Sequence, residues 1–229
     1  MRLRALLPEQ HLSDDSRHLL ETGLGIIGTI GGLVLGLLVA SAFGTYNAQR
    51  TSLIQLSSNV IVLDRVLAHY GREANGVRAA LRGTVAQTID AIWPPRGKTS
   101  NVDPSQSSGD KVFDTFEQLN PQTDRQRALK GIAVGLIIGL AQTRWLMYQQ
   151  LQLGFSTPLL VVLIFWFTVT FIGLGIFTKA NPTVVVALFL AAVAVSGALL
   201  LLQQMYTPFQ GAMQISSEPL RQALAHLGK

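Results

Sequence analysis

Three stretches of the sequence contain no charged side chain and are each long enough to cross a lipid bilayer. They cover residues 22–44, 157–178 and 183–202. A helix rises about 1.5 Å per residue, so roughly 20 residues match the ~30 Å thickness of the hydrocarbon layer. The composition agrees, because 48% of the residues are hydrophobic and 14% are charged, against about 25% charged in typical soluble domains. We therefore predict an all-α integral membrane protein with three transmembrane helices.

The block between the first two stretches, residues 45–156, is too polar to span a membrane but carries a helical pattern. Apolar or aromatic side chains recur in it at alternating steps of three and four residues: Leu53, Leu56, Val60, Leu63, Leu67 and Tyr70. This spacing places them on one face of a helix, which we call the seam. No proline separates the seam from residues 22–44, so we expect one long helix to run to about Tyr70, where Gly71 would end it. The block is interpreted as a helical cytoplasmic domain.

A second helix of this domain is expected over residues 73–92, and the two prolines that follow Trp93 would end it. The next segment, residues 96–110, is rich in Ser, Gly, Pro and Asp. Such a composition is typical of loops. We therefore predict a mobile surface loop at residues 96–110.

A further helix is predicted over residues 121–153. Its apolar core, residues 131–141, is bracketed by Lys130 and Arg144. This core is short for a span, because a bilayer needs about 20 apolar residues. We interpret the segment as a buried helix of the cytoplasmic domain, and the alternative is a segment that dips into the membrane.

The distribution of positive charge predicts the orientation of the chain. Residues 45–156 carry twelve Lys and Arg against eight Asp and Glu, whereas the turn between the second and third stretches carries one lysine. Because basic loops stay in the cytoplasm, we expect a plasma-membrane protein, in a bacterium an inner-membrane one, with this block and residues 203–229 cytoplasmic and residues 1–21 outside. The same rule accounts for the net charge of +5, so no nucleic-acid partner is expected. The tail would form a short amphipathic helix that lies on the membrane or docks on the central domain.

The first apolar stretch carries a stripe of small residues at every fourth position: Gly28, Gly32, Gly36, Ala40 and Gly44. Small residues let helix backbones approach closely in lipid. One interpretation is packing against either of the other two spans. The other is packing against copies of the same helix around a symmetry axis. In that case larger side chains would face a lumen: Ile26, Ile27, Ile30 and Leu33 or Leu37. A lumen lined in this way is a hydrophobic gate.

Several classes of function are disfavoured by what the sequence lacks. The three stretches contain no ionisable residue, which coupled transporters and pumps usually need, so a passive pore or a membrane anchor is favoured. The chain has no cysteine and none of the common nucleotide-binding or hydrolase motifs. We expect no enzymatic activity and no cofactor.

A weak candidate for a metal site precedes the first stretch. His11, Asp14, Asp15 and His18 are spaced so that a helix would place them on one face. The two carboxylates are more commonly first-turn residues after an N-cap, here Ser13, where the helix dipole stabilises them. An acidic vestibule that concentrates ions is a third interpretation. We assign no metal site.

Six short motifs in order give the chain a resemblance to a known family. They are LPEQHLSDDSR (7–17), LDRVLAHYG (63–71), AIWPP (91–95), LNPQTDRQR (119–127), AQTRW (141–145) and ISSEPLRQALAHLG (215–228). Together they resemble the bestrophin-like family of integral membrane proteins. Its members usually have one more span before the LPEQH motif, so the resemblance implies a span that this sequence does not contain.

The family name implies a likeness to bestrophins, which are pentameric anion channels with a cytoplasmic helical domain and a pore lined by the second of four spans. Residues 22–44 would occupy that second position. Bestrophin pores narrow at apolar and aromatic side chains, whereas this stretch has no aromatic residue before Phe43. The resemblance therefore implies a location for the pore but not its lining chemistry.

Two functions follow from these observations as hypotheses. The first is a homo-oligomeric, ion-channel-like pore lined by residues 22–44, whose partners are the lipid bilayer, further copies of the chain and small inorganic ions. The alternative is a non-conducting membrane-anchored scaffold or sensor that binds a partner protein through its cytoplasmic helices, with the seam as the candidate docking face.

Overall fold

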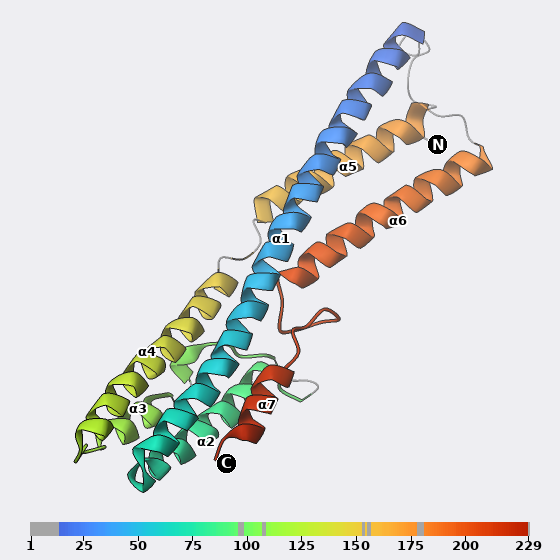
Figure 1. The fold of residues 1–229 in the computed structure, drawn as a ribbon. Helices are drawn as coiled ribbons and strands as arrows, with labels where there is room; N and C mark the ends of the chain where they lie inside the picture. The colour runs from blue at the N-terminus through green and yellow to red at the C-terminus, as the bar shows by residue number, and fades with distance from the viewer. Residues whose placement is uncertain are drawn as a thin grey trace. The chain divides into compact units, whose positions relative to one another are not determined.

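The computed structural model describes residues 14–95, 99–106, 109–152, 154, 157–177 and 181–228. Its regular elements in chain order are α1 (Asp14–Tyr70), η3 (Arg72–Ala74), α2 (Asn75–Ile92), η4 (Pro104–Gln106), α3 (Gly109–Glu117), α4 (Asp124–Gln152), α5 (Thr157–Phe177), α6 (Pro182–Met205) and α7 (Glu218–His226) (Figure 1). These described residues contain no strand, which confirms the all-α prediction.

The chain divides into two compact units, and α1 contributes to both. The first unit comprises Met1–Gly44 and Phe155–Met205, and the second comprises Thr45–Gly154 and Tyr206–Lys229. The helix α1 runs unbroken to Tyr70, as predicted. It ends there because Gly71 has a φ of 129°, a conformation that glycine adopts far more readily than other residues.

The first unit contains the apolar helices. In the described chain, helices long and apolar enough to cross a membrane lie within His18–Tyr70, Asp124–Ile176 and Pro182–Met205, which agrees with the predicted three spans. Compared with those predictions, α5 ends one residue earlier and α6 ends three residues later. Large side chains such as Phe165 and Phe189 are exposed, as side chains that contact lipid would be.

A capping residue begins α6. The side-chain oxygen of Asn181 accepts a hydrogen bond from the N–H of Thr183 at 3.2 Å, and its backbone carbonyl accepts from Val184 and Val185. Asparagine is favoured at this position, and proline is favoured at the first helical residue, here Pro182. Residues 178–180, which belong to the predicted turn, lie outside the described residues.

The hydrophobic core lies in the second unit, and the seam of α1 is its centre. All six seam residues are buried, from Leu53 to Tyr70. Side chains of α2, α3, α4 and α7 complete the core, among them Phe116 and Leu220. The tail helix α7 therefore docks on the central domain, which was one of the two expectations for it.

Polar contacts fix the end of the chain to this domain. Asp64 in α1 accepts two hydrogen bonds from the guanidinium of Arg78 in α2, at 2.7 and 2.9 Å. The same carboxylate accepts a hydrogen bond from the N–H of Gly228 at 3.3 Å. Arg82 donates to the carbonyl of Leu227 at 3.2 Å. Since Leu227 and Gly228 directly follow α7, these contacts hold that helix against α1 and α2.

The prediction that residues 96–110 form one continuous loop is wrong in its extent. Gly109 and Asp110 are the first residues of α3, and Pro104–Gln106 forms the 3-10 helix η4. The helix α3 is amphipathic and buries Val112 and Phe116, which are four residues apart and share one face. Residues 96–98 and 107–108 of the predicted loop lie outside the described residues.

The helix α4 begins at Asp124, three residues later than predicted. The hydroxyl of Thr123 accepts a hydrogen bond from the N–H of Gln126 at 3.2 Å, so Thr123 is the capping residue. The helix is only half buried: Ala133 and Ile137 lie in the core, whereas the neighbouring Ile138 is exposed. Its apolar segment therefore belongs to the domain with one face and presents the other to the surroundings.

Candidate functional site

The part of α1 in the first unit has one face that contacts α5. Along this face lie Leu24, Gly28, Gly31 and Leu35, at steps of four, three and four residues. These steps keep the four residues on one side of the helix. Leu24, Gly31 and Leu35 are buried and Gly28 is half buried. Gly28 belongs both to this face and to the small-residue stripe.

The approach of α5 is close because glycine occupies the contact points on α1. A Cβ atom added at Gly28 would lie 3.5 Å from Cγ2 of Thr170, and one added at Gly31 would lie 3.5 Å from the ring of Phe167. These are ordinary van der Waals distances, so a side chain larger than alanine would have to displace α5. Close backbone approach through small residues is the usual mode of helix association in lipid.

The remaining members of the stripe do not contact α5. A Cβ atom added at Gly32, Gly36 or Gly44 would meet no heavy atom of the chain within 4 Å, and Ala40 is exposed. The reason is geometric, because each step of four residues exceeds a full helical turn by about 40°. The stripe therefore winds around α1 and leaves the α5 contact after Gly28.

The candidate pore-lining residues lie on the opposite side of α1. Ile26, Ile30, Leu33 and Leu37 repeat the same steps of four, three and four, and their exposed fractions are 57%, 44%, 65% and 72%. This series is offset by two residues from the α5-contact series, which corresponds to about 200° around the helix. Ile27, the fifth candidate, is half buried between the two faces. Four large apolar side chains thus form a continuous free face.

Hydroxyl groups do not make the free face polar. The side chain of Thr29 donates a hydrogen bond to the carbonyl of Gly25 at 2.8 Å. Thr168 and Thr170 in α5 make the same bond to the carbonyl four residues earlier, at 2.7 and 2.9 Å. Such bonds satisfy the hydroxyl within its own helix. The hydroxyl protons are therefore engaged within the helices and are not available as donors to an anion.

The weak metal candidates lie only partly within the described residues. Asp14, Asp15 and His18 belong to α1, and His11 lies outside the described residues. Among the residues that the structure describes, no three His, Cys, Asp or Glu side chains lie close enough to hold a metal ion.

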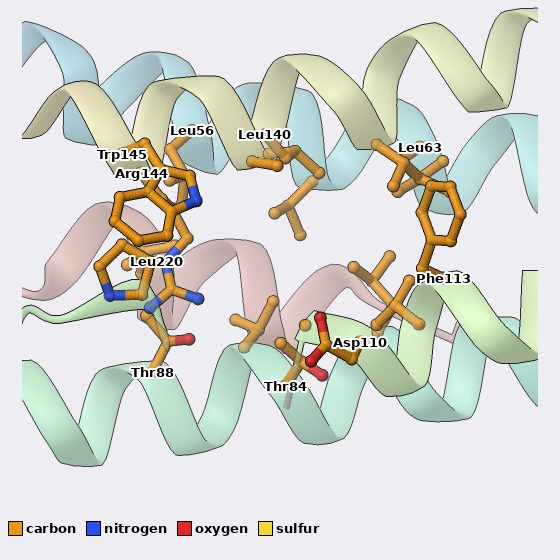
Figure 2. Close-up of a pocket in the computed structure, with 18 residues that line it drawn as sticks. Leu56, Leu63, Thr84, Thr88, Asp110, Phe113, Leu140, Arg144, Trp145 and Leu220 are labelled. Carbon is orange, nitrogen blue, oxygen red and sulfur yellow. The ribbon is translucent and has the colours of Figure 1, made fainter. Parts of the chain in front are cut away.

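A cavity in the second unit was not predicted from the sequence. It has a volume of about 220 Å³ and is lined by side chains from α1, α2, α3, α4 and α7, with Arg144 among them (Figure 2). In the sequence, Arg144 is distinguished only as a charged residue that follows the apolar core of α4. One signal in the sequence could have indicated that Arg144 faces the interior of the domain. It shares one face of its helix with the apolar residues Ile137, Leu140 and Met147.

Comparison with known proteins matches nearly the whole chain to one family model. The model, described as Bestrophin-like domain, matches residues 2–220. Comparison with curated proteins gave no match. Comparison with solved structures gave none either.

Proposed function

Since the chain belongs to the bestrophin-like family, we propose that it is a membrane protein whose copies assemble around an axis into an ion-channel-like pore. In this proposal α1 lines the axis with Ile26, Ile30, Leu33 and Leu37. The second unit would form a cytoplasmic vestibule, in keeping with its basic composition and the positive-inside rule. Small inorganic ions would be the permeating species.

The observation that carries this proposal is the division of α1 into two faces. One face is taken by α5, and the opposite face presents four large apolar side chains at helical spacing. A ring of such faces would make a narrow apolar constriction, which controls ion flow by losing or gaining water. Gly32 and Gly36, which have no neighbouring side chain within 4 Å of an added Cβ atom, lie between the two faces. A neighbouring copy of α1 could approach closely there.

A flux measurement tests the proposal. Purified protein in liposomes should pass current or release a trapped halide, and Ile30→Asn or Leu33→Asn should raise conductance because an amide wets the constriction. Leu190→Asn is the matched control, because Leu190 is an exposed apolar residue of α6 and lies outside the proposed lining. Silent liposomes that contain an intact oligomer would contradict the channel proposal, and so would equal effects of the three substitutions.

The scaffold alternative loses the docking face on which it depended. The seam residues Leu56, Val60, Leu63 and Leu67 are buried within a single chain, with exposed fractions of 5% or less. A foreign helix would have to displace the core of the second unit to reach them. The buried seam therefore favours the pore over the scaffold.

A further inference from the structure

The cavity of the second unit combines an apolar wall with a few polar groups. Its wall includes Leu56, Leu63, Val85, Ile137 and Leu220, and its volume is about 220 Å³. For comparison, an engineered apolar cavity of about 150 Å³ binds benzene. The present cavity therefore has room for one ring of that size together with a small polar group.

Arg144 supplies a positive charge to this space. Its guanidinium points from α4 toward α2 (Figure 2). A guanidinium carries five N–H donors, yet within the described residues it makes no hydrogen bond and no ion pair. Asp103 is close enough to act on the guanidinium electrostatically, but the two do not form an ion pair. No described residue thus occupies the donors of Arg144, which a ligand could use.

A second polar group lies next to this charge. The side chain of Thr88 in α2 is directed toward the guanidinium of Arg144 (Figure 2). Thr88 is 7% exposed, and its hydroxyl makes no hydrogen bond within the part of the chain that the structure describes. The hydroxyl is therefore open to a hydrogen bond with a ligand or water in the cavity. Arg144 and Thr88 together form a donor-rich end of the cavity.

The other end of the cavity has the opposite charge. Asp110, at the start of α3, lies away from Arg144 and beside Thr84 (Figure 2). An anionic group would be repelled from that end and attracted to the guanidinium. The two charged residues that line the cavity therefore favour one orientation of an elongated anion, with its charged group at the Arg144 end.

We propose that this cavity binds a small organic monocarboxylate with an apolar body. The carboxylate would accept hydrogen bonds from Arg144 and Thr88, since a guanidinium fork matches the two oxygens of a carboxylate. The apolar body would lie among Leu63, Val85 and Ile137. An inorganic anion would leave the apolar wall without contacts, and a neutral molecule would leave the guanidinium unpaired. The proposal concerns the second unit alone and does not depend on ion conduction.

Three probes separate the contributions of charge and apolar surface. The full chain in detergent or nanodiscs is titrated with phenylacetate, phenylacetamide and acetate, and binding is followed by calorimetry. We expect saturable binding of phenylacetate, at least tenfold weaker binding of the neutral amide and no saturable binding of acetate. The tenfold figure is a lower bound, because hydrogen bonds between charged partners are roughly twice as strong as those between neutral ones. Equal binding of phenylacetate and its amide, or no binding of phenylacetate, would overturn the proposal.

Two variants test the named residues. Arg144→Gln should weaken phenylacetate binding at least tenfold and leave the amide unaffected, whereas Arg125→Gln, at an exposed arginine of the same helix, should change neither. Thr88→Val keeps the shape of the side chain, removes the hydroxyl and should weaken phenylacetate severalfold. Should Arg144→Gln fail to fold, the amide comparison and Thr88→Val still decide the question. Unchanged phenylacetate affinity in Thr88→Val and in any folded Arg144→Gln protein would place the ligand elsewhere and refute the assignment.

Discussion

Asp64 has a buried carboxylate that forms an ion pair with Arg78 inside the second unit. Its side chain is 3% exposed, and the side chain of its partner Arg78 is 16% exposed. The hydrogen bond from Arg78 to the Asp64 carboxylate raises the pKa of Arg78, and this outweighs the opposite effect of burial. Burial alone would raise the pKa of Asp64, but the hydrogen bonds from Arg78 and from the N–H of Gly228 bring it below its ordinary value. The pair is therefore ionised at neutral pH. Removing one partner would leave a buried charge without compensation.

Asp64→Asn should accordingly lower the free energy of unfolding of the second unit by about 3 kcal/mol. Denaturant titration of the detergent-solubilised protein measures this change. Asp90→Asn, at an exposed aspartate of α2, is the control and should change it by less than about 0.5 kcal/mol. In the double variant with Arg78→Gln the loss should be smaller than the sum of the two single losses, and strict additivity would count against the pair.

At the scale of the elements, glycine determines how closely α1 and α5 pack. Gly28 and Gly31 of α1 leave room for side chains of α5, and Gly173 of α5 leaves room for the side chain of Leu24 in α1. A Cβ atom added at Gly173 would overlap the side chain of Leu24. Gly175 is only two residues further along α5, but a Cβ atom there would meet no heavy atom within 4 Å.

Gly173→Leu should therefore destabilise the first unit, and Gly175→Leu should not. Overpacking of a tight contact costs about 1–3 kcal/mol, so the apparent melting temperature in detergent should fall in the first variant alone. A comparable fall in both variants would mean that the loss of glycine itself, rather than the contact with Leu24, is responsible.

The elements that could be predicted from the sequence are those whose pattern is long. The apolar stretches and the seam extend over many turns, so their length and periodicity identify them without tertiary information. The helix α3 could not be predicted, because it has nine residues and buries only Val112 and Phe116, a pair too short to reveal a period. The cavity could not be predicted either, since residues as far apart as Leu56, Arg144 and Leu220 line it. The two faces of α1 were only partly predictable. A small residue such as Gly28 indicates a close helix contact, but it does not indicate which helix makes that contact.

At the scale of the whole molecule, the free face of α1 is the surface from which an oligomer is proposed. The chain contains no cysteine, so a single introduced thiol can be cross-linked without background. Leu33→Cys should give cross-linked pairs of subunits with a short bismaleimide, because residues that line a shared axis lie close to their copies. Gly31→Cys is the control, because Gly31 is buried against Phe167 and should remain uncross-linked. A purely monomeric product from Leu33→Cys would contradict a shared axis at this face.

The second unit is built from two segments that are far apart in the sequence, and this determines when it can finish folding during synthesis. Its core requires Leu220, which is fully buried, together with the seam of α1, and α5 and α6 lie between these segments in the sequence. The ribosome must therefore release both apolar helices before the last part of the core exists. Until then the faces that later contact α7 stay uncovered. We therefore expect α5 and α6 to insert into the bilayer before α7 completes the core of the second unit.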